Sequence, residues 1–335
     1  MHSVMKNYLL ALLLFSLLSC SSNKEKVAIS EKTSPIINVP AFNGDSAYHF
    51  IKKQVDFGPR VPNSNPHQKA GDFLVKKLKA YGAIVLEQNF TAETFDGQRL
   101  KLRNIIASYY PEKQKRILLA AHWDTRPFAD KDPQKPNAPF DGANDGASGV
   151  GVLLEVARVL HSNDTPNIGI DIIFFDGEDW GEPENQSNHV SLPKGLDSWW
   201  CLGSQHWAKN KHKGGYAAYF GILLDMVGGK NARFYREEIS QQYAPYIVDK
   251  VWNAAGTLGY SHVFVNTSQG SVTDDHYYVN TLGKIPMIDI INFDPANKNF
   301  GDFHHTTKDN MDVISKETLQ VVGNTLLHVL YQEEK

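Results

Sequence analysis

Acidic and histidine side chains follow the apolar segments of this 335-residue chain, at the points where the segments end. His122 and Asp124 come directly after the first such segment, and Glu178 and Asp179 come shortly after the second. The other members of the set lie at comparable positions or in the loops between segments: Asp145, Asp225, Asp274, Asp275, His276, His304 and His305. So many carboxylates at one edge of a fold would repel one another unless a cation lay among them. The sequence therefore predicts a metal site.

Zinc is the cation that this set of donors fits best. A mixture of imidazole and carboxylate ligands favours zinc or a similar transition metal, whereas calcium and magnesium prefer oxygen ligands alone. Three protein ligands with one open position are typical of a catalytic zinc site. The chain has only two cysteines, Cys20 and Cys201, which excludes a disulfide scaffold and a cysteine-based zinc finger. Cys201 lies among Trp199, Trp200 and Leu202 and is predicted to be a buried, unreactive thiol.

Each of the acidic and histidine residues also has an ordinary structural interpretation. Asp145, in the loop GANDGASG, could cap the helix that follows, and Asp225 could be a turn residue. Glu178 and Asp179 could be a solvated pair in a loop. His305 alone is more often an exposed or hydrogen-bonded histidine than a ligand. Separate structural roles would not explain why all of these residues lie at the ends of predicted elements, so the shared location favours a common site.

Apolar segments of strand length alternate with segments of helical periodicity. Four segments are typical of buried strands: residues 116–121, 168–175, 216–226 and 286–291. Three are typical of helices: residues 147–161, 241–258 and 315–331, the last with Ser315 and Thr318 in its capping region. This alternation predicts an α/β fold whose sheet is covered by helices on both faces.

Two long polar inserts follow predicted strand ends, at residues 126–141 and 181–196. In open α/β sheets the ligand crevice lies outside the carboxyl ends of the strands, so we expect both inserts to rim an active site. No segment of linker composition interrupts residues 41–335, and we expect one domain there.

The composition limits the classes of partner. The chain has 34 basic and 37 acidic residues, a net charge of −3, which argues against general nucleic-acid binding. Apolar residues make up 41% and charged residues 21% of the chain, as in ordinary globular proteins. No second apolar stretch of about 20 residues follows the N-terminal one, so a membrane-spanning protein is not expected.

The N-terminal residues are typical of an export signal. Lys6 precedes an apolar segment over residues 8–18, which is too short to span a bilayer. The sequence Leu17-Leu18-Ser19-Cys20 resembles a bacterial lipobox, in which cleavage leaves a lipid-modified cysteine at the new N-terminus.

We therefore expect a signal peptide over residues 1–19, a lipid anchor at Cys20 and a flexible tether over residues 20–40. Such a protein would be exported to the bacterial cell envelope, on the periplasmic side or at the outer membrane. The alternative is a plain secretory signal in which Cys20 is incidental.

The order of the motifs HWD, GANDGASG, FFDGED, LLDMVG, DDH and HT resembles that of the co-catalytic zinc aminopeptidases and their relatives, the zinc-dependent glutaminyl-peptide cyclotransferases. The segment FGPRVPNSNPHQKA is similar to one that precedes the first helix in that family. The resemblance spans residues 46–332. It implies a central, mixed, mostly parallel β-sheet flanked by helices on both faces.

The resemblance implies which residues bind the metal. Asp145, Asp179 and His305 correspond to the zinc ligands of the family. In the dinuclear aminopeptidases, His122 and Asp225 would hold a second zinc, with Asp145 as the bridge. The cyclotransferases keep similar residues but bind one zinc, so one zinc per chain is expected here.

The resemblance also implies catalytic and substrate-binding residues. Glu178 corresponds to the general acid and base, and Asp225 and Asp274 would belong to a hydrogen-bonded network of acids beside it. The residues expected to contact the substrate are Trp180, Phe300 and His304.

Glutaminyl-peptide cyclotransferase is the activity that the motifs favour. The triplet DDH stands where aminopeptidases more often have Ser-Asp-His, and Phe300 precedes His-His-Thr as in cyclotransferases. The expected partners are peptides or proteins with an N-terminal glutamine, and the expected state is a monomer. A zinc aminopeptidase remains an alternative, because His122 and Asp225 could hold a second metal. A non-catalytic, peptide-binding lipoprotein of the envelope is a further alternative, although such a protein would have no need of Glu178.

Overall fold

The computed structural model describes residues 38–183, 191–296 and 299–333. The predicted signal peptide over residues 1–19, Cys20 and nearly all of the predicted tether lie outside the described residues. Among the described residues, no helix is long and apolar enough to cross a membrane.

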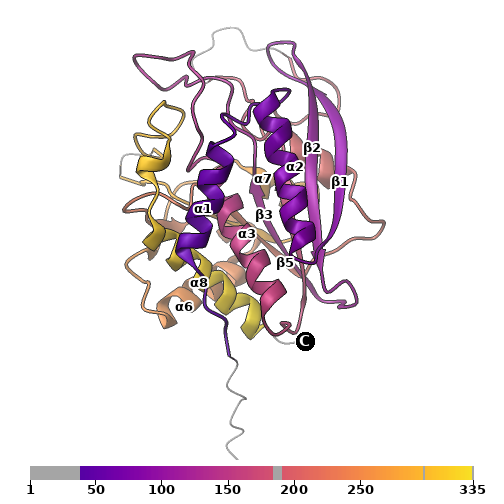
Figure 1. The fold of residues 1–335 in the computed structure, drawn as a ribbon, viewed down its shortest axis with the longest axis vertical. Coiled ribbons are helices and arrows are strands. Elements are labelled where there is room, and N and C mark those ends of the chain that lie inside the picture. The colour runs from indigo at the N-terminus through magenta and orange to yellow at the C-terminus, as the bar shows by residue number, and fades with distance from the viewer. Residues whose placement is uncertain (1–37, 184–190, 297–298, 334–335) are drawn as a thin grey trace, which may run out of the picture. The chain divides into compact units, whose positions relative to one another are not determined.

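A six-stranded sheet runs through the described part of the chain (Figure 1). Its strands, in spatial order, are β1 (Ile84–Glu93), β2 (Arg99–Tyr109), β4 (Gly169–Phe175), β3 (Arg116–His122), β5 (Phe220–Asp225) and β8 (Met287–Ile291). The pairs β1–β2 and β2–β4 are antiparallel, whereas β4–β3, β3–β5 and β5–β8 are parallel. The predicted mixed, mostly parallel sheet is thus confirmed.

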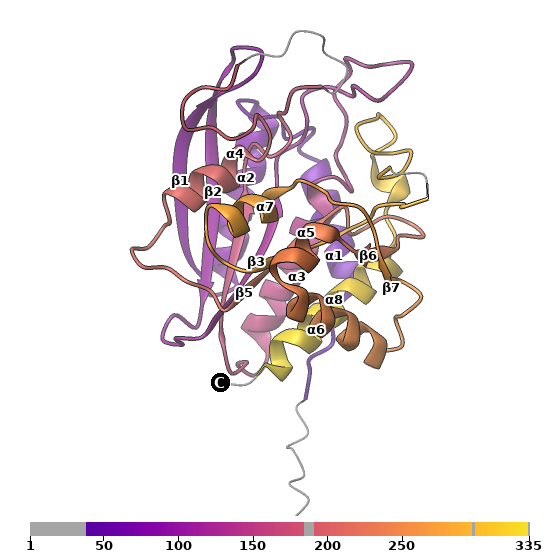
Figure 2. The ribbon, with the colours of Figure 1, turned by 180° about the vertical axis from the view of Figure 1, so that it is seen from behind.

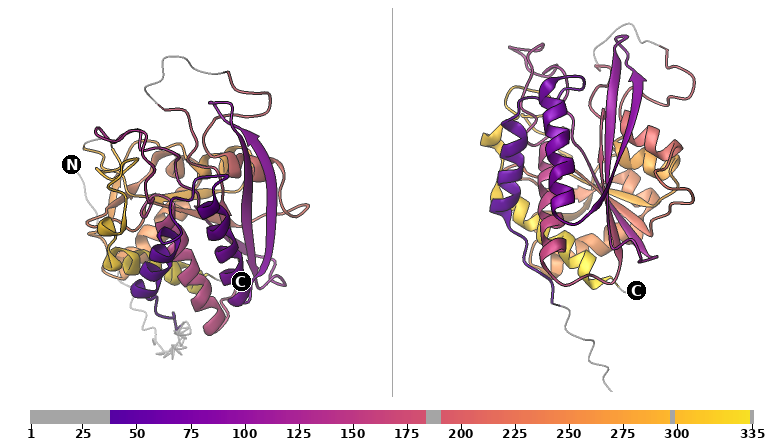
Figure 3. Two further views of the ribbon diagram at one scale, coloured as in Figure 1. Left: turned by 45° about the horizontal axis from the view of Figure 1, so that its top comes forward. Right: turned by 45° about the vertical axis from the view of Figure 1, so that its right-hand side comes forward.

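Helices cover both faces of the sheet because its central strands are apolar on both sides. In β3, Ile117 and Leu119 face one hydrophobic core, and Leu118 and Ala120 face the other. The first core is covered by α1 (Gly44–Val55), α2 (Asn65–Ala80), α3 (Ala147–Ser162), α6 (Pro245–Thr257) and α8 (Lys316–Gln332). The second is covered by α4 (Leu202–Lys209) and α7 (Asp275–Thr281). Figure 2 shows the face with α4 and α7, and Figure 3 shows the layers edge-on at right.

Most of the predicted elements are found close to their expected bounds. The strand predicted over residues 216–226 is shorter and begins at Phe220. The helix predicted over residues 315–331 is α8, and the Ser315 side chain accepts a hydrogen bond from the backbone N–H of Thr318.

The helical conformation predicted over residues 241–258 is found, with one interruption. Two helices occupy this region, α5 (Glu238–Tyr243) and α6, and Ala244 between them has a non-helical backbone. Pro245 causes the break, because its ring disfavours a helical conformation at the preceding residue. Pro245 then begins α6, where a missing N–H costs no hydrogen bond.

A second, two-stranded parallel sheet is formed by β6 (Phe234–Arg236) and β7 (Phe264–Ser268), and one 3-10 turn covers Met311–Val313. The four parallel strands β3, β4, β5 and β8 all end at the same edge of the large sheet. The loops that leave this edge carry the acidic and histidine residues identified in the sequence.

Candidate active site

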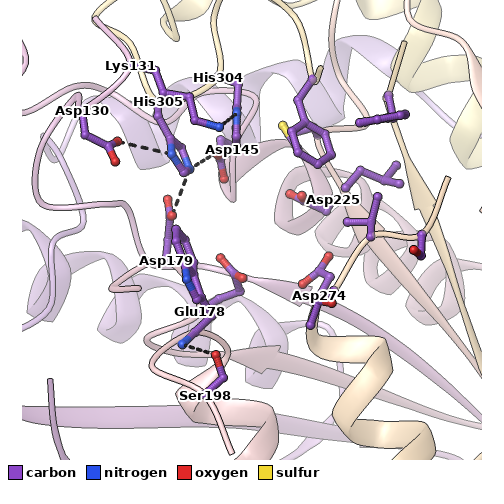
Figure 4. Close-up of a pocket in the computed structure, with 18 residues that line it drawn as sticks. Asp130, Lys131, Asp145, Glu178, Asp179, Ser198, Asp225, Asp274, His304 and His305 are labelled. Atoms are coloured by element: carbon purple, nitrogen blue, oxygen red, sulfur yellow. Dashed lines mark hydrogen bonds and ion pairs between the residues drawn. The ribbon is translucent and has the colours of Figure 1, made fainter. Parts of the chain in front are cut away.

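A cavity of about 370 Å³ opens at the carboxyl ends of the parallel strands (Figure 4). Acidic and histidine side chains line one part of it, and apolar and small polar side chains line the rest. The lining residues are Asp130, Lys131, Asp145, Glu178, Asp179, Ser198, Trp200, Asp225, Met226, Ser271, Val272, Thr273, Asp274, Ile291, Phe293, Phe300, His304 and His305. An enclosed space with a few convergent charged groups is the usual form of a small-molecule or peptide-terminus site.

The three predicted metal ligands converge in this cavity. Nε2 of His305 lies 3.1 Å from Oδ1 of Asp179 and 3.6 Å from Oδ2 of Asp145. All three side chains are buried, and Oδ1 of Asp179 has no hydrogen-bond donor among the described residues. Burial alone would lower the pKa of His305, but Asp179 and Asp130 outweigh burial and raise it to about 9. The site therefore attracts positive charge, and its mixed imidazole and carboxylate donors fit a divalent transition metal.

The polar insert over residues 126–141 contacts His305 on the side of the ring away from Asp179. Its second ring nitrogen, Nδ1, lies 3.4 Å from Oδ1 of Asp130, and Arg126 donates two hydrogen bonds to the same carboxylate. Asp132 accepts hydrogen bonds from the backbone and the hydroxyl of Thr307. A carboxylate on the second nitrogen of a histidine fixes the ring orientation and the tautomer that binds a metal.

Two buried carboxylates fix the loops that carry the other ligands. Each oxygen of Asp124 accepts one backbone N–H, from Glu178 and from Asp179, both at 3.1 Å. Asp309 does the same for Asn144 and Asp145, at 2.7 and 3.0 Å. These contacts hold the backbone of both loops, so the side chains of Asp145 and Asp179 need not supply that support.

A cluster of acids lies beside the metal ligands. Glu178, Asp225 and Asp274 line the same cavity, and Figure 4 shows their carboxyl groups directed into it. Burial, and then the carboxylates of Asp274 and Asp179, raise the pKa of Glu178 well above its ordinary value, against an opposing effect of His122. Burial and Asp145 similarly raise the pKa of Asp225 to about 7. The cluster can therefore hold and exchange a proton near neutral pH.

His122 connects the metal ligands with this cluster. Its Nε2 lies 3.1 Å from Oδ1 of Asp145 and 3.3 Å from Oδ1 of Asp225. The three side chains form a group that could hold a cation of its own, with Asp145 shared between it and the first site. The geometry thus retains the arrangement expected of a two-metal site.

The comparisons with known proteins agree with this geometry. The family described as Peptidase family M28 matches residues 104–330 of the chain. The chain belongs to peptidase family M28.

Relatives of this M28 protein have been given two kinds of name. A solved structure described as a Zn-dependent exopeptidase from Parabacteroides distasonis is 52% identical, with a TM-score of 0.84, over 88% of this chain and 100% of that one. The glutaminyl cyclase of Bacteroides thetaiotaomicron, bound to N-acetylhistamine, is 51% identical, with a TM-score of 0.83, over 89% and 100%. Aminopeptidase YwaD of Bacillus subtilis is 28% identical over 83% of this chain, which spans only 54% of that relative's length. The predicted resemblance to zinc aminopeptidases and cyclotransferases is confirmed.

The residues predicted to contact the substrate of this M28 protein lie in two places. Phe300 and His304 line the cavity, and their ring centres lie 4.6 Å apart. Trp180 does not line it but packs in a separate apolar cluster, where its Nε1 donates to Asp96. Trp200 occupies the wall instead, with its ring stacked 6.0 Å from that of His305.

The two polar inserts differ in their relation to the M28 site. The first, over residues 126–141, contributes Asp130 and Lys131 to the cavity wall, as predicted. None of the described residues of the second, over residues 181–196, lines the cavity, although Ser198 just beyond it does. The hydrogen bonds by which Asp124 and Asp309 hold the loop backbones were not predicted. The only signal in the sequence was the position of Asp124 at the end of a predicted strand.

Proposed function

We propose that this M28 protein is a glutaminyl-peptide cyclotransferase, which converts an N-terminal glutamine into pyroglutamate and releases ammonia. The observation that carries the proposal is the 51% identity with a glutaminyl cyclase whose whole solved chain is covered. The cavity agrees with it, because a half-buried acid, Glu178, lies next to the metal ligands in a space that fits one side chain and a peptide terminus.

Asp145, Asp179 and His305 are the residues that would hold a zinc ion, and zinc bound there supplies a Lewis acid for the side-chain carbonyl of the glutamine. Glu178 takes a proton from the substrate α-amine, whose nitrogen forms a bond with the carbon of that carbonyl. The bond from this carbon to the amide nitrogen then breaks, and Glu178 returns the proton to the leaving ammonia. One residue thus serves as base and then as acid.

The acids around Glu178 suit this exchange. Asp225 and Asp274 face the cavity with it, and burial raises the pKa of all three carboxyl groups. A group with a raised pKa can accept a proton from the amine and release it again at neutral pH, which a fully exposed carboxylate does poorly.

The aromatic part of the cavity wall would hold the substrate in a folded conformation. Phe293 and Phe300 meet edge to face with ring centres 5.0 Å apart, and Trp200 closes the side next to His305. Apolar walls fit the methylene groups of a glutamine side chain. Because the attack is intramolecular, holding that chain curled supplies much of the rate.

A zinc aminopeptidase is the second candidate, and one observation favours it. His122, Asp145 and Asp225 are placed to hold a further cation, which would help to activate a water molecule. We propose one zinc per chain, since a cyclotransferase needs no water nucleophile. Two tightly bound metals per chain, measured by elemental analysis, would favour the aminopeptidase.

A direct assay separates the two activities. The protein is incubated with a glutamine-initiated peptide and with a leucine-initiated peptide of the same downstream sequence. A cyclotransferase removes one ammonia from the first peptide and leaves the second unchanged, as mass spectrometry would show. Release of free leucine, or of free glutamine, would overturn the proposal.

We further propose export to the bacterial cell envelope and anchoring by a lipid on Cys20, as a monomeric enzyme. The lipobox-like sequence around Cys20 supports this location. Expression of the full chain in a bacterium with a labelled fatty acid should label the wild type but not Cys20→Ser. Equal labelling of both proteins would contradict it.

A further inference from the structure

We propose that Glu178, Cys201 and Asp274 form a second cation site, which takes thiophilic divalent cations and blocks the enzyme when it is filled. The binding step depends only on the three side chains. The block rests on the proposed function, in which Glu178 transfers the proton.

The thiol is fixed directly beside the acid. Cys201 precedes α4 with a left-handed backbone, φ 57°, and its N–H donates to the backbone oxygen of Glu178 at 2.9 Å. Its Sγ–H donates to Oε1 of the same residue at 3.2 Å. Cys201 is fully buried, and it is the only cysteine in the described part of the chain. The thiol thus contacts a carboxyl group that itself lines the cavity.

Asp274 supplies the third donor. Its Oδ1 accepts the backbone N–H of Asp275, whereas its buried Oδ2 has no hydrogen-bond donor among the described residues. One ligand atom from each of Glu178, Cys201 and Asp274 lies within 4.8 Å of the other two. Figure 4 shows the carboxyl groups of Glu178 and Asp274 directed into the same space. Asp274 therefore offers this cluster a buried carboxylate oxygen that no donor among the described residues satisfies.

The chemistry of these donors selects the cation. A sulfur ligand with two carboxylates favours zinc or cadmium over calcium and magnesium. Without a cation the thiol keeps its proton, because burial, and then the negative charge of Glu178, raise the pKa of Cys201 well above its ordinary value. On binding, a metal–sulfur bond forms and the proton leaves to solvent through the cavity. No electron is transferred.

A filled site would prevent proton transfer at Glu178. The carboxyl group would be a metal ligand and could no longer take a proton from an amine. The resident-metal ligands Asp145, Asp179 and His305 include no sulfur, so a thiolate-to-metal absorption band can arise only from Cys201 or Cys20. This difference allows the two sites to be observed separately.

The test uses the full chain with its resident zinc, titrated with cadmium. Cys20→Ser serves as the matched control, because it leaves Cys201 as the only thiol. We expect Cys20→Ser to show one cadmium–thiolate band in the ultraviolet, in parallel with loss of cyclotransferase activity. In Cys20→Ser/Cys201→Ser the band should vanish, and the half-inhibiting cadmium concentration should rise about tenfold or more. Zinc content measured after the titration shows whether cadmium has displaced the resident metal.

A second measurement needs no substitution at Cys201. In Cys20→Ser, X-ray absorption at the cadmium edge should show a cadmium–sulfur bond, and a chelator of cadmium should remove it. A Cys20→Ser protein with neither the ultraviolet band nor the cadmium–sulfur bond would overturn the proposed site. A cadmium–thiolate band without loss of activity would refute the proposed inhibition but would still support the proposed cation site. A band in a protein that cyclises no glutamine peptide would contradict the proposed function alone.

Discussion

Asp124→Asn should both destabilise the protein and slow its reaction, because Asp124 ties β3 to the loop with Glu178 and Asp179. The Asp124 side chain is fully buried, and each of its oxygens accepts one backbone N–H at 3.1 Å. An asparagine side chain retains one acceptor oxygen. Its amide group would then face a backbone N–H, so that two donors meet and one hydrogen bond is lost.

The expected size follows from these contacts. A hydrogen bond to a buried charged acceptor contributes about 1.5–3 kcal/mol, and an unsatisfied buried donor costs about 1–3 kcal/mol. Because the two effects overlap, we expect the free energy of unfolding to fall by about 2–4 kcal/mol in urea titrations. The acid at position 178 would shift with its backbone, and a displacement of about 1 Å can lower the rate about 10²-fold. The rate should be measured with a glutamine-initiated peptide at saturation.

Asp249→Asn is a matched control on the surface. The Asp249 side chain is 58% exposed and forms an ion pair with Arg236, of a kind that contributes about 0–1 kcal/mol. It should leave the activity unchanged. If Asp124→Asn were as stable and as active as this control, the role assigned to Asp124 would be refuted.

Three further predictions concern single side chains. Glu178→Gln should lower turnover about 10²–10⁴-fold while the metal content stays unchanged, since the proton carrier is lost and the ligands remain; near-normal turnover would exclude Glu178 as the acid and base. His305→Ala should sharply reduce the zinc content found by elemental analysis, and an unchanged content would remove His305 from the ligand set. Burial would raise the pKa of Glu237, but hydrogen bonds with His276 and Ser240 outweigh it and hold the pKa at about 2, below the ordinary 4.5. The lowered pKa therefore stabilises the fold above pH 4.5, and this stabilisation is lost as the pH falls towards 2. In Glu237→Gln the free energy of unfolding should decrease less steeply between pH 4.5 and 2 than in the wild type. An equal decrease in both proteins would contradict the contribution assigned to Glu237.

The parallel strands and the edge where the site lies were predictable from the sequence. Each buried strand is a continuous apolar segment, and the polar residue that ends it must lie at the same edge as its neighbours. His122 and Asp225 were placed correctly for this reason. The interruption before Pro245 was not predicted, although proline restricts the conformation of the residue that precedes it.

The contacts between loops were not predictable in the same way. Trp180 and Trp200 lie on either side of the insert over residues 181–196, and only the path of the loop decides which ring reaches the cavity. Asp309 supports Asp145 across 164 residues of sequence. The sequence predicted a buried thiol at Cys201, but its contact with Glu178 depends on how α4 begins.

His305 is carried by a loop rather than by a strand, and its position depends on Asp130 and Asp132 in the insert over residues 126–141. Two segments of the gene, separated by more than 160 codons, are thus under one selective constraint. A change at Asp130 or at Thr307 should be accompanied, among descendants of this sequence, by a compensating change in the other segment. Transfer of the loop with His305 alone into a related protein would move the histidine without the contacts of Asp130 and Asp132. The two loops must therefore be transferred together for the metal site to keep its geometry.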